Sequence, residues 1–168
     1  MTANGHECAR SQLSMDWTHL HLALNHVPVL GTPFLLCLLL WSWAGRQAVT
    51  LRLCLWLFVA LAAASVAIKF TGDFAAEKVK GSPEFDKTLI DQHEESADQA
   101  TTAVFFMGIA AASALFLSRG ERPTTHWSLG LLALMALATF ALMARTANFG
   151  GNIRHPEIRP GEVRHGGP

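Results

Sequence analysis

The sequence predicts an all-α membrane protein, a four-helix transmembrane bundle with both ends of the chain on the same side. Hydrophobic residues make up 51% of the chain and charged residues only 15%, which is too little polar surface to cover a soluble globule of 168 residues. Four apolar runs are long enough, at about 17 to 25 residues, to cross a bilayer as helices. Runs such as FLLCLLLWSW lack the alternation of a transmembrane β-strand.

The predicted spans are residues 17–44, 51–70, 93–117 and 127–145. The chain is thereby divided into a polar N-terminal tail at 1–16, a four-helix transmembrane domain at 17–145 and an extended C-terminal strap at 146–168. The tail has neither the basic start nor the short apolar core of a cleavable signal. We therefore expect the first span itself to direct insertion.

Local signals justify the course and the ends of each span. In the first span, Pro28 and Pro33 predict a bend, which neighbouring helices can accommodate in a membrane. The second is expected to stop at Gly72. The third is expected to begin outside the membrane, at the Ser-Pro-Glu triplet of residues 82–84. In the fourth, the Gly-Gly pair at residues 150–151 is expected to turn the chain.

Four spans in series place both chain ends and the second loop on one side, here called side A. The loops at residues 45–52 and 118–126 lie on the other, side B. Side B carries a net charge of +3 and side A a net charge of −3. Arginine is denser in the short loops of side B, so we expect side B to be cytoplasmic and side A periplasmic in a bacterial inner membrane.

Four histidines are expected at the side A ends of the spans: His21, His26, His93 and His155. On a helical wheel, His93 falls on the apolar stripe that faces the bundle, whereas the acids of the adjoining HEESAD run fall on the side that faces water. An inward histidine needs a hydrogen-bond partner or a ligand. Because no CxxCH motif is present, covalent c-type haem is not predicted.

Three short motifs resemble those of a family of small bacterial four-helix inner-membrane proteins of unknown function. The run HLALNHVP at residues 21–28 is similar to that family's His-x4-His-Phe-Pro opening, with Val in place of Phe. The Thr-Gly step at residues 71–72 and the run GGNIRH at 150–155 also match its pattern. Some members of that family are attached to c-type cytochrome domains. The resemblance therefore implies a periplasmic c-type cytochrome or a larger redox complex as partner.

The leading functional prediction is a membrane electron-transfer subunit that binds haem b near the periplasmic face. A b-type haem in a bundle is held by two neutral imidazoles from different helices, and His26 and His93 are the predicted pair. The polar residues expected to bind the propionates at the side A rim are Asn25, Lys69, Arg145 and Asn148. Arg145 is expected to pair either with such a propionate or with Asp73.

Two alternatives stay open at this point. One is a bare Zn, Cu or Fe ion held by His21, His26, His93 and His155. The other is a non-catalytic anchor or assembly subunit whose histidines only form hydrogen bonds. Neither HExxH nor paired ExxH motifs occur, which disfavours hydrolytic and oxygenase chemistry, and enzymatic activity is left undecided. Membrane lipid is an expected neighbour, and nucleic acid is not.

Overall fold

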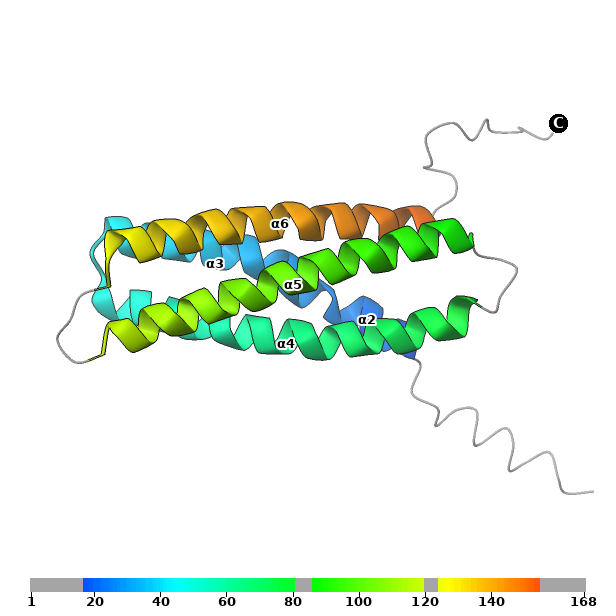
Figure 1. Ribbon diagram of the computed structural model, residues 1–168, viewed down its shortest axis with the longest axis horizontal. Helices are drawn as coiled ribbons and strands as arrows, with labels where there is room; N and C mark the ends of the chain where they lie inside the picture. Colours follow the sequence, from blue (N-terminus) through cyan, green and yellow to red (C-terminus); the bar gives the residue numbers. More distant parts are fainter. Residues whose placement is uncertain (1–16, 81–85, 120–123, 155–168) are drawn as a thin grey trace, which may run out of the picture.

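The computed structural model describes residues 17–80, 86–119 and 124–154, and it is an all-α bundle (Figure 1). Its helices are α2 at Trp17–Leu24, α3 at His26–Ala44, α4 at Ala48–Lys80, α5 at Lys87–Leu117 and α6 at His126–Arg154. α2 and α3 together form the first span. The four spans run alternately up and down, and each packs beside two others in the cyclic order α3, α4, α5, α6. The predicted four-helix bundle is confirmed.

The surface of the bundle is apolar over most of its length. Large hydrophobic side chains point outward, including Phe34 at 65% exposure and Leu134 at 64%. Such a surface is unfavourable in water but is solvated by acyl chains. All four spans are long and apolar enough to cross a membrane. The chain is therefore a multi-pass membrane protein.

The core is a narrow stripe along the inside of the bundle. Leu39, Phe58, Val104 and Leu132, one from each span, are completely buried in it. Between α4 and α5 the backbones come close, because Gly108 faces Ala62 with no room for another methyl group. Small residues are what allow membrane helices to approach each other in this way.

A break at Asn25 separates α2 from α3. Pro28 has no N–H to donate to the Leu24 carbonyl, and its ring crowds that carbonyl, which weakens the helix at this point. The first span is thus interrupted before Pro28, whereas α3 continues through Pro33. Beyond the break, α2 packs against α4, and within the described ranges it has no backbone contact with α5 or α6.

Two predicted helix ends are wrong. α4 continues through Gly72 to Lys80, and α6 continues through the Gly-Gly pair at 150–151 to Arg154. The strap predicted from residue 146 is thus helical as far as 154, and residues 155–168 lie outside the described ranges. Glycine inside a helix costs about 1 kcal/mol relative to alanine. Gly72 and Gly150 have a packing reason, given below with the site.

The start of α5 also differs from the prediction. The helix begins at Lys87, and the Asp86 carboxylate caps it by accepting a hydrogen bond from the Thr88 backbone N–H at 2.9 Å. Aspartate is among the preferred N-cap residues for this reason. The triplet at residues 82–84, where the helix was expected to begin, lies outside the described ranges.

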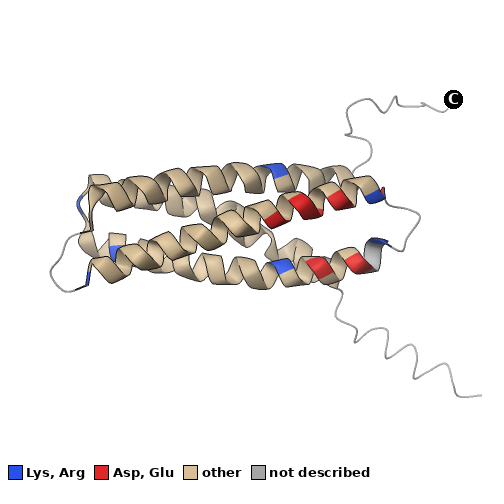
Figure 2. Ribbon diagram, in the orientation of Figure 1, with Lys and Arg blue, Asp and Glu red and all other residues tan. Residues whose placement is uncertain are grey.

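Charged residues differ sharply between the two ends of the bundle (Figure 2). All described acids lie on the side A halves of α4 and α5: Asp73, Glu77, Asp86, Asp91, Glu94, Glu95 and Asp98. The charged residues described at the side B end are Arg46, Arg52 and Arg119. One end of the molecule is therefore acidic and the other basic.

Candidate functional site

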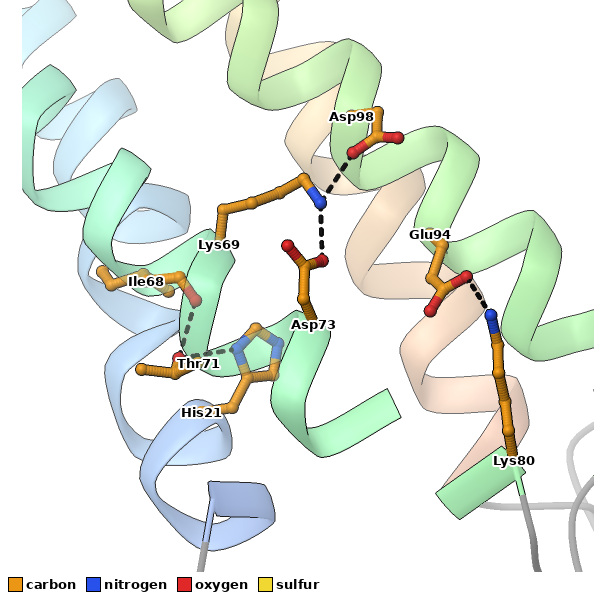
Figure 3. Close-up of polar contacts among 8 residues, drawn as sticks. All are labelled: His21, Ile68, Lys69, Thr71, Asp73, Lys80, Glu94 and Asp98. Atoms are coloured by element: carbon orange, nitrogen blue, oxygen red, sulfur yellow. Dashed lines mark hydrogen bonds and ion pairs between the residues drawn. The ribbon is translucent and has the colours of Figure 1, made fainter. Parts of the chain in front are cut away.

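His21 is half-buried between α2 and α4 at the side A end (Figure 3). Its Nδ1 lies 3.2 Å from the Thr71 Oγ1. The Thr71 hydroxyl donates its own hydrogen to the Ile68 carbonyl at 2.6 Å, so the Thr71 oxygen accepts from His21. Since a neutral imidazole carries one ring hydrogen, the hydrogen is on Nδ1. Nε2 of His21 is left with a lone pair.

Gly72 provides the space for the His21 ring. A Cβ atom at position 72 would lie 2.7 Å from Cε1 of His21, closer than real side chains approach. The imidazole therefore rests directly on the backbone of α4. This contact gives a physical reason for a glycine within the helix, where it costs stability.

His93 has the same arrangement at the contact between α5 and α6. Its half-buried ring donates from Nδ1 to the Thr146 carbonyl oxygen at 3.1 Å, which again leaves Nε2 with a lone pair. A Cβ at Gly150 would lie 3.3 Å from Cε1 of His93. Ser96 and the Thr146 hydroxyl form a 2.8 Å hydrogen bond beside the ring and tie α5 to α6.

The two imidazoles form a pair at one end of the bundle. Each bridges two helices, rests on a glycine and donates from Nδ1. Their helices, α2 and α5, are not packed against each other in the described part of the chain. The two Nε2 lone pairs thus belong to helices whose described residues do not touch each other. Hydrogen bonds at Nδ1 are the usual way in which proteins orient histidines that bind metals through Nε2.

Lys69 on α4 lies near His21 and binds two carboxylates (Figure 3). Its Nζ is 2.6 Å from Oδ1 of Asp73 and 2.8 Å from Oδ1 of Asp98. The ammonium was predicted to bind a haem propionate. Two carboxylates already neutralise it, so a propionate would have to compete with them.

Lys80 makes a similar bridge nearer the end of α4. Its Nζ is 2.5 Å from Oε2 of Glu94 and 3.5 Å from Oδ1 of Asp91. The hydrogen bond to Glu94 raises the pKa of the Lys80 ammonium, which stays charged at neutral pH. The acids of α5 were expected only to face water. Asp91, Glu94 and Asp98 instead form a stripe that is paired with the lysines of α4.

His26 lies in a different environment from His21 and His93. It is exposed, and its Nδ1 donates to the Leu22 carbonyl one turn earlier in the same span at 2.9 Å. The structure therefore brings His21, rather than His26, to the inside of the bundle with His93. His155, the fourth predicted ligand, lies outside the described residues.

The other predicted site residues lie at the side A end with distinct contacts. Arg145 is exposed and places its guanidinium 5.5 Å from the centre of the Phe149 ring. Among the described residues, no ion pair joins it to Asp73, which is bound by Lys69. Asn25 occupies the helix break without a side-chain capping bond, and Asn148 accepts a 3.2 Å hydrogen bond from Asn152.

Several contributing residues were not identified from the sequence as part of a site. Thr71 and Gly72 hold one imidazole, and Thr146 and Gly150 hold the other. A signal was present, because Thr146 and Gly150 are four residues apart and therefore share one helix face. In the ranges that the structure describes, no group of three His, Cys, Asp or Glu side chains is placed to share a metal ion.

Comparisons with protein-family models, curated proteins and solved structures find no match for this chain.

Proposed function

We propose that this protein is a membrane electron-transfer subunit that binds one haem b at side A, with His21 and His93 as axial ligands. The observation that carries the proposal is the hydrogen bonding of both rings. Each donates from Nδ1 to a fixed oxygen, at Thr71 and Thr146, and so presents an unprotonated Nε2. Neutral imidazoles oriented in this way are what a haem iron requires of two axial histidines.

The number of grouped ligands favours haem over a bare ion. Haem iron needs only two protein ligands, because the macrocycle supplies four nitrogens, whereas Zn or Cu sites draw three or four ligands from the protein. His21 and His93 are two half-buried imidazoles, and the helices that carry them are not packed together. A flat macrocycle between two such rings needs that separation.

Arg145 is the residue best suited to bind a propionate. Its exposed guanidinium sits at the side A end of α6, stacked on Phe149, and Asp73 is already bound by Lys69. Arginine binds carboxylates through paired N–H donors, which suits the edge of a macrocycle. Asn148, three residues after Arg145 on α6, and Asn25, at the break in the first span, would supply further hydrogen bonds.

A haem bound at this end would accept and release single electrons. The chain would contribute orientation of the two imidazoles, a helix bundle that holds them in lipid, and an acidic stripe on α5 that is paired with the lysines of α4. We propose side A as the periplasmic face of a bacterial inner membrane. The redox partner would then be a periplasmic c-type cytochrome or a larger complex, as the sequence motifs also suggest.

Three histidine variants test the proposal. The protein would be produced with haem supplied and purified in mild detergent, and the dithionite-reduced minus oxidised spectrum would be recorded. We expect b-type α and Soret bands in the wild type, their loss in His21→Ala and His93→Ala, and their retention in His26→Ala. His26→Ala is the matched control, because it removes an exposed imidazole from the same span.

Each contrary result has a defined meaning. A wild-type protein without haem bands would reject the haem proposal, and elemental analysis would then separate a metal centre from an accessory subunit. Unchanged haem in both His21→Ala and His93→Ala would reject this ligand pair. Loss of haem in His26→Ala with retention in His21→Ala would instead support the pair of His26 and His93.

A further inference from the structure

A pocket of about 670 Å³ lies at the side B end, opposite the histidine pair. It is formed where α3 ends, α4 begins, α5 ends and α6 begins, and its wall includes Arg46, Arg52, Trp43 and His126. Its volume falls within the range of about 300 to 1,000 Å³ that is typical of small-molecule sites. The proposed electron-transfer function makes no use of it.

The polar part of this pocket is basic. Arg46 and Arg52 both line it, and the described residues of this end include no acid (Figure 2). Arg52 donates one hydrogen bond, to the Ser118 carbonyl at 3.1 Å. A guanidinium has five N–H donors, so most of those on Arg52 remain available to a ligand. The pocket therefore offers two guanidinium groups to an anion.

His126 adds a neutral donor to the two arginines. Trp43 donates from its indole N–H to Nδ1 of His126 at 2.8 Å, so Nδ1 accepts and the ring hydrogen of the neutral form is on Nε2. That N–H can donate to an oxygen of a ligand.

Apart from Ser42, Ser118 and Thr124, the remainder of the pocket wall is apolar. Leu51, Leu55 and Leu129 line it, as does Val49, which is 86% exposed on the outer surface of α4. The basic groups sit at the ends of the spans, and the leucines and the valine extend from there along helices that cross the membrane. A ligand that matches this wall has an anionic head and an apolar tail.

We propose that this pocket binds the headgroup of an anionic phospholipid from the side B leaflet. Arg46 and Arg52 bind the phosphate, His126 donates to a headgroup oxygen, and the first part of the acyl chains lies against Val49 and the pocket leucines. Basic pockets between transmembrane helices recognise phospholipid headgroups through the same chemistry. The lipid would fix the relative positions of all four spans at this end.

The test measures which lipids stay with the full-length protein. The protein would be incubated in mixed micelles with equal amounts of phosphatidylglycerol and phosphatidylcholine and repurified, and retained lipid would be measured by mass spectrometry. We expect the wild type to retain phosphatidylglycerol in preference to phosphatidylcholine. Each arginine removed should reduce this preference about fivefold, first in Arg46→Gln and then further in Arg46→Gln/Arg52→Gln. Arg119→Gln is the matched control, because Arg119 lies at the same end, stacked on Phe116, but does not line the pocket.

Four results would overturn the proposal. One is equal retention of the two lipids by the wild type, and another is an equal loss in Arg119→Gln. A third is full competition by inorganic phosphate or glycerol phosphate at the lipid concentration, which would indicate a site for free phosphate. Finally, a co-purified quinone whose retention depends on His126 would assign the pocket to a different ligand. Arg52→Gln removes a hydrogen bond to the end of α5 and could disturb that helix. Arg46→Gln avoids this problem, because the Arg46 side chain has no hydrogen bond to α5 among the described contacts.

Discussion

Hydrogen bonds at Nδ1 decide which nitrogen a neutral histidine can offer to a metal. In this protein the acceptors are of two kinds, a threonine hydroxyl for His21 and a backbone carbonyl for His93. A carbonyl acceptor survives substitution of its own side chain, whereas a hydroxyl acceptor does not. Thr71 is therefore a positioning residue that mutation can remove, while the acceptor of His93 is built into α6.

We predict that Thr71→Val weakens haem binding about 10- to 100-fold, as is typical when a group that orients a metal-binding histidine is lost. Valine keeps the shape of threonine but cannot accept from His21. Affinity would be measured by titrating haem into the apoprotein, and the midpoint potential by redox titration. Thr102→Val is the control, since Thr102 is exposed on α5 and takes no part in the contacts of either histidine. Equal affinities for wild type and Thr71→Val would show that Thr71 does not position His21.

The choice between His21 and His26 could not be made from the sequence, and the reason is geometric. On a helical wheel His21 and His26 lie about 140° apart, on different faces, and no local pattern shows which face of the first span meets the other helices. The wheel did place His93 correctly on the inner side of α5, because that helix is continuous from Lys87 to Leu117.

At the scale of the helix, the length of the apolar runs predicted the four spans correctly. The helix ends predicted from glycine were wrong. Gly72 and Gly150 were taken as stops because glycine favours helix ends in general. Both instead lie inside helices, where an imidazole from a neighbouring helix occupies the place of a side chain. Contacts between helices distant in sequence decide such cases, and a local pattern does not contain them.

Three glycine-to-alanine variants should separate packing on histidine from helix propensity. Gly72→Ala places a methyl group 2.7 Å from the His21 ring and should reduce haem retention most. At Gly150 the corresponding distance to His93 is 3.3 Å, and the loss should be smaller. Gly151→Ala meets nothing within 4 Å, so it should keep haem and raise stability by up to about 1 kcal/mol.

Thermal unfolding and haem content, measured on the same preparations, check this order. If Gly151→Ala lost as much haem as Gly72→Ala, the effect would come from the helix backbone and not from contact with the imidazole. If all three variants kept full haem content, the histidines would not depend on these glycines for their position.

At the scale of the whole molecule, the two ends have different chemistry. At side A lie the histidine pair and two lysines, each paired with acidic side chains. At side B the described charged residues are three arginines, two of which line the pocket. The count of Lys and Arg in short loops near the spans, rather than net charge, governs orientation in a membrane. Arginine is denser in the short loops of side B, whereas side A has nine Lys and Arg in total against four on side B. From the loop density we predict that side B is cytoplasmic, and this orientation would present the histidine pair to periplasmic partners.

Reporter fusions test that orientation directly. Alkaline phosphatase, which is active only after export, should be active when fused after residue 168, and green fluorescent protein fused there should be dark. Fused after residue 122, in the second side B loop, the two reporters should give the opposite pattern. Reversal of both pairs of results would place side A in the cytoplasm, because the whole bundle inserts as one unit with alternating spans. The proposed haem site would then exchange electrons with a cytoplasmic donor, and a periplasmic cytochrome could not be its direct partner.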